Sequence, residues 1–321
     1  MNKEPIFIVA GEPNSVFLEI FFKSIKLNKF KSPLVIIVSK KLLKSQMNKL
    51  GFFYKLNTIN KNLNSFYKLD NKKINLIDVN YKFGKCFEKI SDKSNNYIEE
   101  TFNVALDILK KNKFSKFING PISKKHFLKG KKLGITEYLA QKTKRENRVA
   151  MLIFNKKLSV SPITTHLALK NVNKNISKHK IDNHIRLVAE FYRKNFKKDP
   201  RIAITGLNPH CESNFKDCEE DAKIIPAIIN LKNKNFKVQG PFPADTIFMQ
   251  QNLKEFDVIV GMYHDQVLTP MKALFGFNAI NITLGLPFLR ISPDHGPNSS
   301  MLGKNLSNPK SLIEALKFLD K

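Results

Sequence analysis

The sequence has few cysteines, few arginines and no long apolar runs, and each shortage excludes a class of protein. Three cysteines in 321 residues are too few, and odd in number, for the disulfide framework of a secreted scaffold. The longest apolar runs, such as 34–38 and 258–260, fall far short of the roughly 20 residues that cross a bilayer. The N-terminal residues carry neither a long apolar stretch nor a small-residue cleavage site. We therefore expect a cytoplasmic protein with no membrane partner.

The positive charge is large, but lysine carries almost all of it. Lys and Arg number 55 against 27 Asp and Glu, a formal net charge of +28, yet only six residues are arginine. Nucleic-acid-binding proteins use arginine for bidentate contacts and gather charge on one element. Here the lysines are scattered among Asn, Ile and Phe. The composition therefore favours a diffuse solvated surface over a nucleic-acid site.

The remaining composition predicts a folded α/β chain. Apolar residues make up 42% of it, with 26 Phe, which excludes disorder for most of the length. Short β-rich runs alternate with longer segments whose apolar residues recur every three or four positions, which predicts mostly parallel strands joined by helices. The expected strands are 6–9, 34–38, 117–118, 150–154, 158–163, 202–205, 258–261 and 279–283, and the expected helices are 17–25, 41–50, 96–110, 180–195, 217–232 and 311–319.

Three histidines share one context, because His166, His210 and His264 each stand at the end of a β-rich run. In open α/β sheets ligands bind outside the carboxyl ends of the strands, so all three are expected at one edge. Three imidazoles that converge there would bind a divalent transition metal, although a lone histidine at a strand end is more often structural. The histidines in lysine-rich or helical stretches are expected at the surface: His126, His179 and His184.

A second group of polar residues follows His264 along the chain. Lys272, Asn281 and Arg290 fall within one segment, whose glycines and proline allow tight turns between them. Arginine is rare here, and its guanidinium is the preferred bidentate partner of phosphate or carboxylate. For Arg290 a ligand contact and a structural ion pair are equally consistent with the sequence, and Lys272 taken alone is consistent with a solvated lysine.

Six motifs, in order across nearly the whole chain, resemble the signature of one family. They are T-T-H-L (164–167), G-L-N-P-H (206–210), P-A-D-T (243–246), Y-H-D-Q (263–266), N-I-T-L-G-L-P-F-L-R (281–290) and D-H-G (294–296). Together they resemble the PdxA family of 4-hydroxythreonine-4-phosphate dehydrogenases, which serve pyridoxal phosphate (vitamin B6) biosynthesis. Six ordered motifs are far more specific than any lone short pattern.

The resemblance implies an isocitrate-dehydrogenase-like fold of two α/β domains with a cleft between them. We expect the first domain to comprise 1–125 and 275–321, and the second, with the dimer contacts, to comprise 126–274. The resemblance also implies a homodimer with active sites at the subunit interface, where one divalent metal is held by two histidines of one subunit and one of the other: His166 and His210, and the partner's His264. Zinc, cobalt, magnesium, nickel and iron stay open.

The resemblance also assigns substrate, cofactor and catalytic residues. The positions that match its substrate-binding residues are Thr136, Lys272, Asn281 and Arg290. The turn Asp294, His295, Gly296 is similar to the NAD-binding loop of this fold group, which lacks the Rossmann glycine fingerprint, so NAD or NADP is the expected cofactor. Lys124 matches a family lysine near the cleft and would assist proton transfer, although a solvated loop lysine is equally consistent. Asp245 is predicted as a second catalytic residue, and both Asp245 and Asp265 would orient metal-bound histidines.

The implied reaction is the oxidation of 4-phosphooxy-L-threonine. The metal would stabilise the alkoxide developing at the substrate's secondary hydroxyl, and hydride would pass to NAD. The resulting β-keto acid would lose carbon dioxide and give 3-amino-2-oxopropyl phosphate.

Three segments depart from the family pattern. The family's G-D-P-x-G-I-G-P-E is G-E-P-N-S-V-F-L-E at 11–19, which replaces two glycines and a proline by bulkier residues. Its G-H-T-E is G-I-T-E at 134–137, so Ile135 stands where the family has a substrate-binding histidine. After Gly296, P-N-S-S at 297–300 replaces T-A-x-[DE].

These departures leave several functions open. The chain can keep the family reaction with an altered pocket, or act on four-carbon sugar-acid phosphates such as erythronate or threonate 4-phosphate. A non-catalytic binding protein is less favoured, because the three histidines and Arg290 are all kept. A metal-dependent hydrolase that uses the same histidines and a basic nucleic-acid-binding protein are the alternatives from other classes.

Overall fold

The computed structural model of the chain describes residues 3–129, 134–212, 218–276, 278–293 and 295–320. Its backbone contacts divide the chain into two compact units: unit 1, which comprises Met1–Ile135 and Pro287–Lys321, and unit 2, which comprises Thr136–Leu286. The chain therefore leaves unit 1 once and returns to it once. The domain boundaries expected from the sequence, near residues 125 and 275, lie slightly before these two crossing points.

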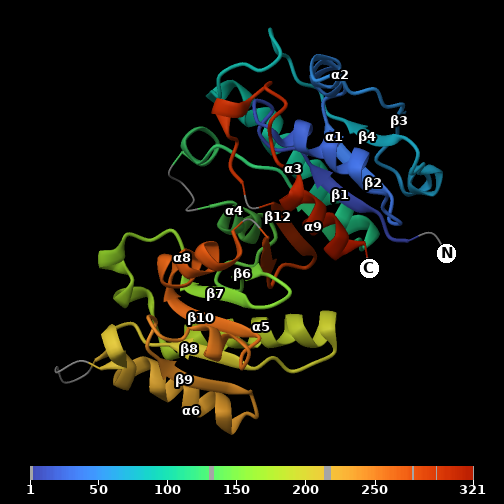
Figure 1. Cartoon of the computed structure of the whole chain (residues 1–321). Helices are drawn as coiled ribbons and strands as arrows, with labels where there is room; N and C mark the ends of the chain where they lie inside the picture. The colour runs from blue at the N-terminus through green and yellow to red at the C-terminus, as the bar shows by residue number, and fades with distance from the viewer. Residues whose placement is uncertain (1–2, 130–133, 213–217, 277, 294, 321) are drawn as a thin grey trace. The chain divides into compact units, whose positions relative to one another are not determined.

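The described part of unit 1 is built on six parallel strands in the order β3-β4-β2-β1-β5-β12 (Figure 1). The strands are β1 (Ile6–Val9), β2 (Leu34–Val38), β3 (Leu56–Thr58), β4 (Ile74–Asp78), β5 (Lys116–Asn119) and β12 (Leu289–Pro293). The central strand β1 is buried at every residue, as expected for a parallel sheet that is covered on both faces. Continuous apolar runs such as this one predicted β1, β2 and the middle of β5, whereas β3, β4 and β12 were not predicted from the sequence.

Four α-helices cover the strands of unit 1 among its described residues: α1 (Phe17–Leu27), α2 (Lys40–Lys49), α3 (Asn95–Asn112) and α9 (Lys310–Leu319). Helix α1 contacts α2 and α9, whereas α3 packs on β1 and β2. The apolar residues of α3 that recur at three- and four-residue steps are all buried: Ile98, Phe102, Ala105 and Leu109. The helical period in the sequence therefore identified the face that packs on the sheet.

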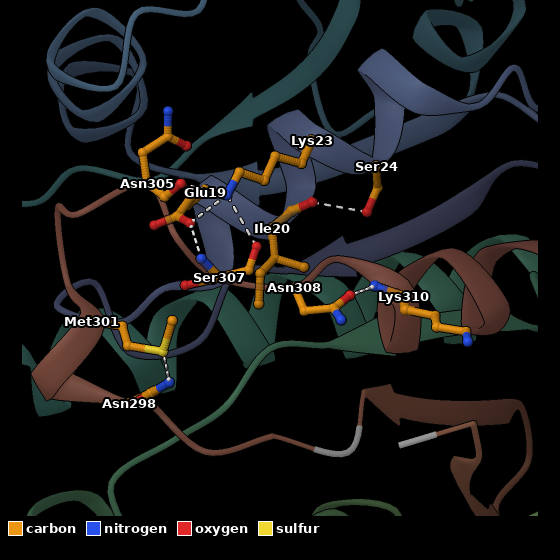
Figure 2. A network of polar contacts seen from close by, with 10 residues as sticks. All are labelled: Glu19, Ile20, Lys23, Ser24, Asn298, Met301, Asn305, Ser307, Asn308 and Lys310. Carbon is orange, nitrogen blue, oxygen red and sulfur yellow. Dashed lines mark hydrogen bonds and ion pairs between the residues drawn. The ribbon is translucent and has the colours of Figure 1, made fainter. Parts of the chain in front are cut away.

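A buried ion pair joins α1 to the segment before α9 (Figure 2). One carboxylate oxygen of Glu19 accepts from Nζ of Lys23 at 2.9 Å and from the backbone N–H of Ser307 at 2.6 Å. Lys23 also donates to the backbone oxygens of Asn305, at 2.9 Å, and of Ser307, at 3.0 Å. Because Glu19 is only 2% exposed, this pair is a buried tie between two parts of the chain that are far apart in sequence.

The described part of unit 2 also carries six strands, in the order β11-β6-β7-β10-β8-β9. The strands are β6 (Ala150–Phe154), β7 (Ser159–Thr164), β8 (Ile202–Thr205), β9 (Val238–Phe242), β10 (Val258–Tyr263) and β11 (Ile280–Leu284). Strand β6 runs antiparallel to both of its neighbours, whereas β7, β10, β8 and β9 are mutually parallel. The predicted α/β fold with mostly parallel strands is confirmed.

The described α-helices of unit 2 are α4 (Ile135–Lys142), α5 (Lys178–Phe196), α6 (Ile225–Asn233), α7 (Gln250–Leu253) and α8 (His264–Phe275). Helix α5 contacts α6, β6, β7 and β11, whereas α8 contacts β7 and β10. A buried apolar cluster joins α8 to the sheet, and its members include Val160, Ile259, Val267 and Met271. Among the described residues of both units, no helix combines the length and apolar character needed to cross a membrane.

The expectation that His184 lies at the surface is wrong. This histidine is 6% exposed on α5, and its Nε2 lies 2.6 Å from the hydroxyl oxygen of Ser161 on β7. Helix α5 turns this face toward the sheet, so a lysine-rich helix still buries one polar residue. His179, in contrast, is exposed as expected, and His126 is partly exposed, with Nδ1 2.9 Å from a carboxylate oxygen of Asp92.

Candidate metal and substrate site

The three candidate metal ligands follow three adjacent parallel strands of unit 2. His166 follows β7, His264 follows β10, and His210 follows β8, and β10 pairs with both of the other strands. Because parallel strands end at the same edge of a sheet, the three histidines stand at the carboxyl edge, where ligands bind in open α/β sheets. The predicted shared edge is confirmed by this topology.

His166 and His264 lie next to each other within one chain. Their ring centroids are 5.7 Å apart, and both residues are half-buried. Metal–nitrogen bonds of about 2 Å place two imidazole rings on one ion with centres roughly 5–6 Å apart, so the pair fits a shared divalent cation. The carboxylate of Asp265 lies 2.6 Å from Nδ1 of His264, an arrangement that leaves Nε2 available as the ligand.

His210 is not brought into one cluster with the other two histidines. It is exposed, in a loop where its backbone φ is +57°, and among the described residues no three histidine, cysteine or acidic side chains are grouped to hold a metal. The sharing of His264 between subunits, which the family resemblance implies, stays a prediction. Within one chain, the structure places His166 beside the chain's own His264, whereas the set that the resemblance implies joins His166 and His210 to the partner's His264.

Among the described residues, no recorded hydrogen bond or ion pair joins Asp245 to His210 or His264. Asp245 itself is exposed, shortly after β9. Burial raises the pKa of the Cys211 thiol, and the nearby carboxylates of Glu220 and Asp245 raise it further. The predicted catalytic role of Asp245 stays a prediction. The carboxylate of Asp265, in contrast, contacts the candidate ligand His264.

Three of the predicted substrate-binding residues lie in unit 2. Thr136, in the first turn of α4, is 6% exposed, and its hydroxyl oxygen lies 3.4 Å from that of Thr283 on β11. Asn281 lies two residues earlier on the same strand and so on the same face. Lys272 is half-buried in the last turn of α8, and burial lowers the pKa of its ammonium group.

The other predicted site residues lie in unit 1. Arg290, on β12, is completely buried, and its Nε donates to the side-chain oxygen of Asn119 on β5 at 2.7 Å. Lys124 is exposed at the start of the short helical turn η3 (Lys124–Leu128). Gly296 is also exposed, and Asp294 lies outside the described residues.

The side chain of His295, in the candidate cofactor turn, is held by contacts with Phe17 and Gly296. Its ring stacks on that of Phe17, with centroids 6.4 Å apart, and its Nδ1 lies 3.0 Å from the backbone oxygen of Gly296. Burial lowers the pKa of His295, although the contact with Gly296 opposes this shift. Its Nε2 is buried without a hydrogen-bond partner among the described residues, as expected of a ring nitrogen that meets a ligand.

A family model for the pyridoxal phosphate biosynthetic protein PdxA matches residues 29–319. The chain belongs to the PdxA family. It is 38% identical to a 4-hydroxythreonine-4-phosphate dehydrogenase of Sulfurihydrogenibium sp., over 97% of this chain and 96% of the relative. It is also 32% identical to a protein of Oceanobacillus iheyensis that is provisionally named a D-threonate 4-phosphate dehydrogenase, over 98% of this chain and 97% of that relative.

Solved PdxA structures share this fold. The 4-hydroxythreonine-4-phosphate dehydrogenase of Klebsiella pneumoniae superposes with a TM-score of 0.85 at 27% identity, covering 98% of this chain and 97% of that one. The corresponding protein of Burkholderia phymatum gives a TM-score of 0.80 at 28% identity, covering 99% and 98%. The family recognised from the six motifs is therefore confirmed along nearly the full length.

Two buried residues that support the His210 loop were not predicted as part of the site. Gln266 is 9% exposed and Glu220 is 1% exposed, and both hydrogen-bond to the loop that carries His210. Gln266 was visible in the sequence, as the last residue of the motif Y-H-D-Q. Glu220 lay in a lysine- and acid-rich stretch that is typical of a solvated helix, so no sequence signal distinguished it.

Proposed function

We propose that the chain is an NAD- or NADP-dependent, divalent-metal-dependent 4-hydroxythreonine-4-phosphate dehydrogenase of vitamin B6 biosynthesis. It oxidises 4-phosphooxy-L-threonine to a β-keto acid, which loses carbon dioxide to give 3-amino-2-oxopropyl phosphate. The observation that carries the proposal is the set of three histidines at the ends of three adjacent parallel strands, in a chain that belongs to the PdxA family. Its similarity to the dehydrogenase of Sulfurihydrogenibium supports the substrate.

His166, His210 and His264 hold the metal in this proposal. When bound, the ion supplies Lewis-acid stabilisation of charge that develops at the substrate's secondary hydroxyl. Asp265 orients the imidazole of His264, because its carboxylate lies 2.6 Å from Nδ1 of that ring. In the homodimer that the family resemblance implies, the partner's His264 completes the set.

The phosphate and the polar groups of the substrate are bound by Thr136, Lys272, Asn281 and Arg290. A buried guanidinium suits a phosphate, because its planar donors match two phosphate oxygens and it never loses its charge. The contact of Nε with Asn119 fixes the plane of the Arg290 side chain from one edge. Lys272 adds positive charge in a partly buried position, where charge acts more strongly than at the surface.

The turn at Asp294, His295 and Gly296 binds the nicotinamide cofactor. His295 is oriented by the ring of Phe17 and by the backbone of Gly296, which supports its use as a rigid contact for the cofactor. Lys124 transfers a proton to or from the substrate, a role that the family resemblance gives it. Asp245 is the second carboxylate that orients a metal-bound histidine.

The decisive experiment is a steady-state assay of NADH formation. Purified protein is supplied with NAD and 4-phosphooxy-L-threonine, with and without a divalent-metal chelator. We expect turnover that the chelator abolishes and that added metal restores. His210→Ala should lose both turnover and bound metal, whereas His179→Ala, at an exposed histidine of α5, should keep both. Normal turnover by His210→Ala would contradict the metal assignment, and product formation without NAD reduction would indicate a hydrolase.

A second candidate is the oxidation of a four-carbon sugar-acid phosphate. It is favoured by the 32% identity to the protein of Oceanobacillus iheyensis and by Ile135, which cannot hydrogen-bond through its side chain. The same assay with erythronate and threonate 4-phosphates tests it. A kcat/KM at least tenfold higher for either compound than for 4-phosphooxy-L-threonine would replace the main proposal by this one.

A further inference from the structure

Gln266 joins the ends of two strands that precede candidate metal ligands. Its side-chain oxygen accepts from the backbone N–H of Met262, at 2.7 Å, and from the hydroxyl of Thr205, at 2.9 Å. Its amide nitrogen donates to the backbone oxygen of Gly206 at 2.8 Å. Met262 lies two residues before His264, and Gly206 is the first residue of the loop that leads to His210. One side-chain amide therefore bonds both segments that carry candidate ligands.

The third ligand-bearing strand is tied to the same place. The hydroxyl of Thr164, the last residue of β7, donates to the backbone oxygen of Met262 at 2.7 Å. Thr164 is 2% exposed and Thr205 is completely buried. A continuous buried layer of hydrogen bonds, from Thr164 through Met262 and Gln266 to Thr205, therefore lies directly beneath the three histidines.

Two glycines allow this close packing. A Cβ at position 261 would lie 3.0 Å from the side-chain oxygen of Gln266 and 2.4 Å from a methyl carbon of Val267. A Cβ at position 206 would lie 2.9 Å from a carboxylate oxygen of Glu220. The contacts of 2.4 and 2.9 Å are shorter than real Cβ atoms show, and 3.0 Å is unusually tight, so a side chain at either position would displace its neighbours in this layer.

Glu220 holds the His210 loop from its other side. Its carboxylate accepts from the backbone N–H of Leu207 at 2.7 Å, and from the backbone and side-chain N–H groups of Asn208 at 2.9 and 2.8 Å. Burial alone raises the pKa of Glu220, but these hydrogen bonds outweigh it, so the pKa lies below its ordinary value. The loop is thus anchored at Gly206 by Gln266 and at the next two residues by a carboxylate.

We propose that Gln266 is a positioning residue for the metal ligands, because it fixes both the strand end before His264 and the loop before His210 in its own chain. In the dimer that the family resemblance implies, these two ligands serve different metal centres, so Gln266 acts on both centres. The inference rests on the proposed function, because it gives these histidines the role of ligands. Gln266 lies in the first turn of α8, and its three hydrogen bonds join that turn to both ligand-bearing segments. Groups that hold metal ligands in place typically contribute 10- to 100-fold in metal affinity.

The test compares Gln266→Met with a matched variant in unit 1. Methionine keeps the size of the side chain and removes all three hydrogen bonds. Asn75→Leu is the control, because Asn75 is 1% exposed and its amide also makes several hydrogen bonds, with Leu34, Asn57 and Asp70, in the other unit. Both variants should unfold at a lower temperature than the wild-type protein.

Metal affinity separates the two variants. We expect Gln266→Met to bind Co²⁺ 10- to 100-fold more weakly in titration calorimetry, with an altered visible spectrum of the bound ion, while Asn75→Leu stays within twofold of the wild type. Equal Co²⁺ affinity of Gln266→Met and the wild type would overturn the proposal. If Gln266→Met does not fold, Thr205→Val, which removes one of the three hydrogen bonds, should show a smaller loss of affinity and decides the question.

Hydrogen exchange gives a readout that needs no metal. In Gln266→Met the backbone amides of 206–212 should exchange faster than in the wild type, whereas those of 150–154 should exchange at the wild-type rate.

A wild-type protein that binds no divalent cation would overturn the metal assignment itself. A wild type that binds Co²⁺, with a Gln266→Met variant that binds equally well and exchanges equally slowly, would overturn only the role of Gln266.

Discussion

The ring of Phe17 stacks on the ring of His295, with centroids 6.4 Å apart and planes inclined by 28°. Phe17 stands where the family pattern has a glycine, and its side chain is completely buried. A Cβ at position 120 would lie 2.7 Å from the ring of Phe17, so the phenyl group fills the space between two loops. The replacement therefore adds a fixed support beneath the candidate cofactor turn.

Replacing Phe17 by leucine should weaken cofactor binding more than it weakens the fold. The KM for NAD should rise about three- to tenfold, because the stacked pair contributes about 1 kcal/mol beyond its buried area. The KM for the phosphorylated substrate should not change. Initial rates with varied NAD measure the effect. Phe22→Leu, a buried aromatic of the same helix, is the control, and an equal rise in that variant would contradict the specific role of Phe17.

Replacing Glu19 by glutamine should lower the free energy of unfolding by about 2–3 kcal/mol. The variant removes the charge partner of the partly exposed ammonium group of Lys23, and it weakens the hydrogen bond from the backbone N–H of Ser307 to the buried side chain at position 19 (Figure 2). Urea denaturation measures the change. The control is Asp107→Asn, which breaks an equally short but exposed pair with Lys111 on α3 and should cost less than about 0.5 kcal/mol. Equal losses in the two variants would show that burial adds nothing at Glu19.

His184 should make the protein less stable in mild acid. Burial, assisted by the charge of Lys180, lowers its pKa from 6.5 to about 3 in the folded state. Stability is therefore complete above the unfolded pKa and falls as the pH drops from 6.5 toward 3, because only the unfolded chain takes up the proton. Between pH 7 and pH 5 this group alone should lower the free energy of unfolding by about 2 kcal/mol.

The variant His184→Asn isolates this effect. It should be less stable than the wild type at pH 7, yet it should lose about 2 kcal/mol less between pH 7 and pH 5. Urea denaturation at both pH values gives the comparison. His179→Asn, at an exposed position of the same helix, should keep the wild-type pH dependence. An unchanged slope in His184→Asn would contradict the assignment.

Replacing Arg290 by lysine should affect both stability and substrate binding. Lysine cannot reproduce the Nε contact with Asn119, so the free energy of unfolding should fall by about 2 kcal/mol. The KM for the phosphorylated substrate should rise at least tenfold, while the KM for NAD stays within twofold. A lower stability with an unchanged substrate KM would make Arg290 purely structural, the alternative that the sequence left open.

The sequence predicted the strands that are short, mainly apolar runs, and it missed strands in which polar residues, glycine or proline interrupt the run. The strands Ile6–Val9, Leu34–Val38, Ala150–Phe154 and Ile202–Thr205 were predicted with correct bounds, because each is a short run of mainly apolar residues. β3 and β4, in which Asn57 and Asn75 interrupt the apolar residues, were missed, and so were β9 and β12. A glycine and a proline interrupt β9, and Arg290 lies inside β12, so neither shows the pattern of a central strand.

The site followed the same division. The three histidines could be predicted because each follows a recognisable β-rich run, and parallel strands bring their ends to one edge of the sheet. The start of α8 at His264 was hidden, because Pro270 within that helix disfavours a helical prediction. The contacts of Gln266 and Glu220 depend on which loops meet after folding. No periodicity in a single sequence contains that information.

The interruption of unit 1 by unit 2 sets an order on synthesis. Thr136–Leu286 is one continuous stretch, so unit 2 leaves the ribosome whole before β12 and α9 have been made. About 170 further residues, roughly 10–30 s of translation, are added after β5 before β12 can pair with it. Throughout that interval β5 presents an unpaired edge, and the side-chain oxygen of Asn119 lacks the hydrogen bond that Arg290 later donates. The nascent chain is therefore most exposed to mispairing at this edge, and a chain that stops before β12 keeps that exposure permanently.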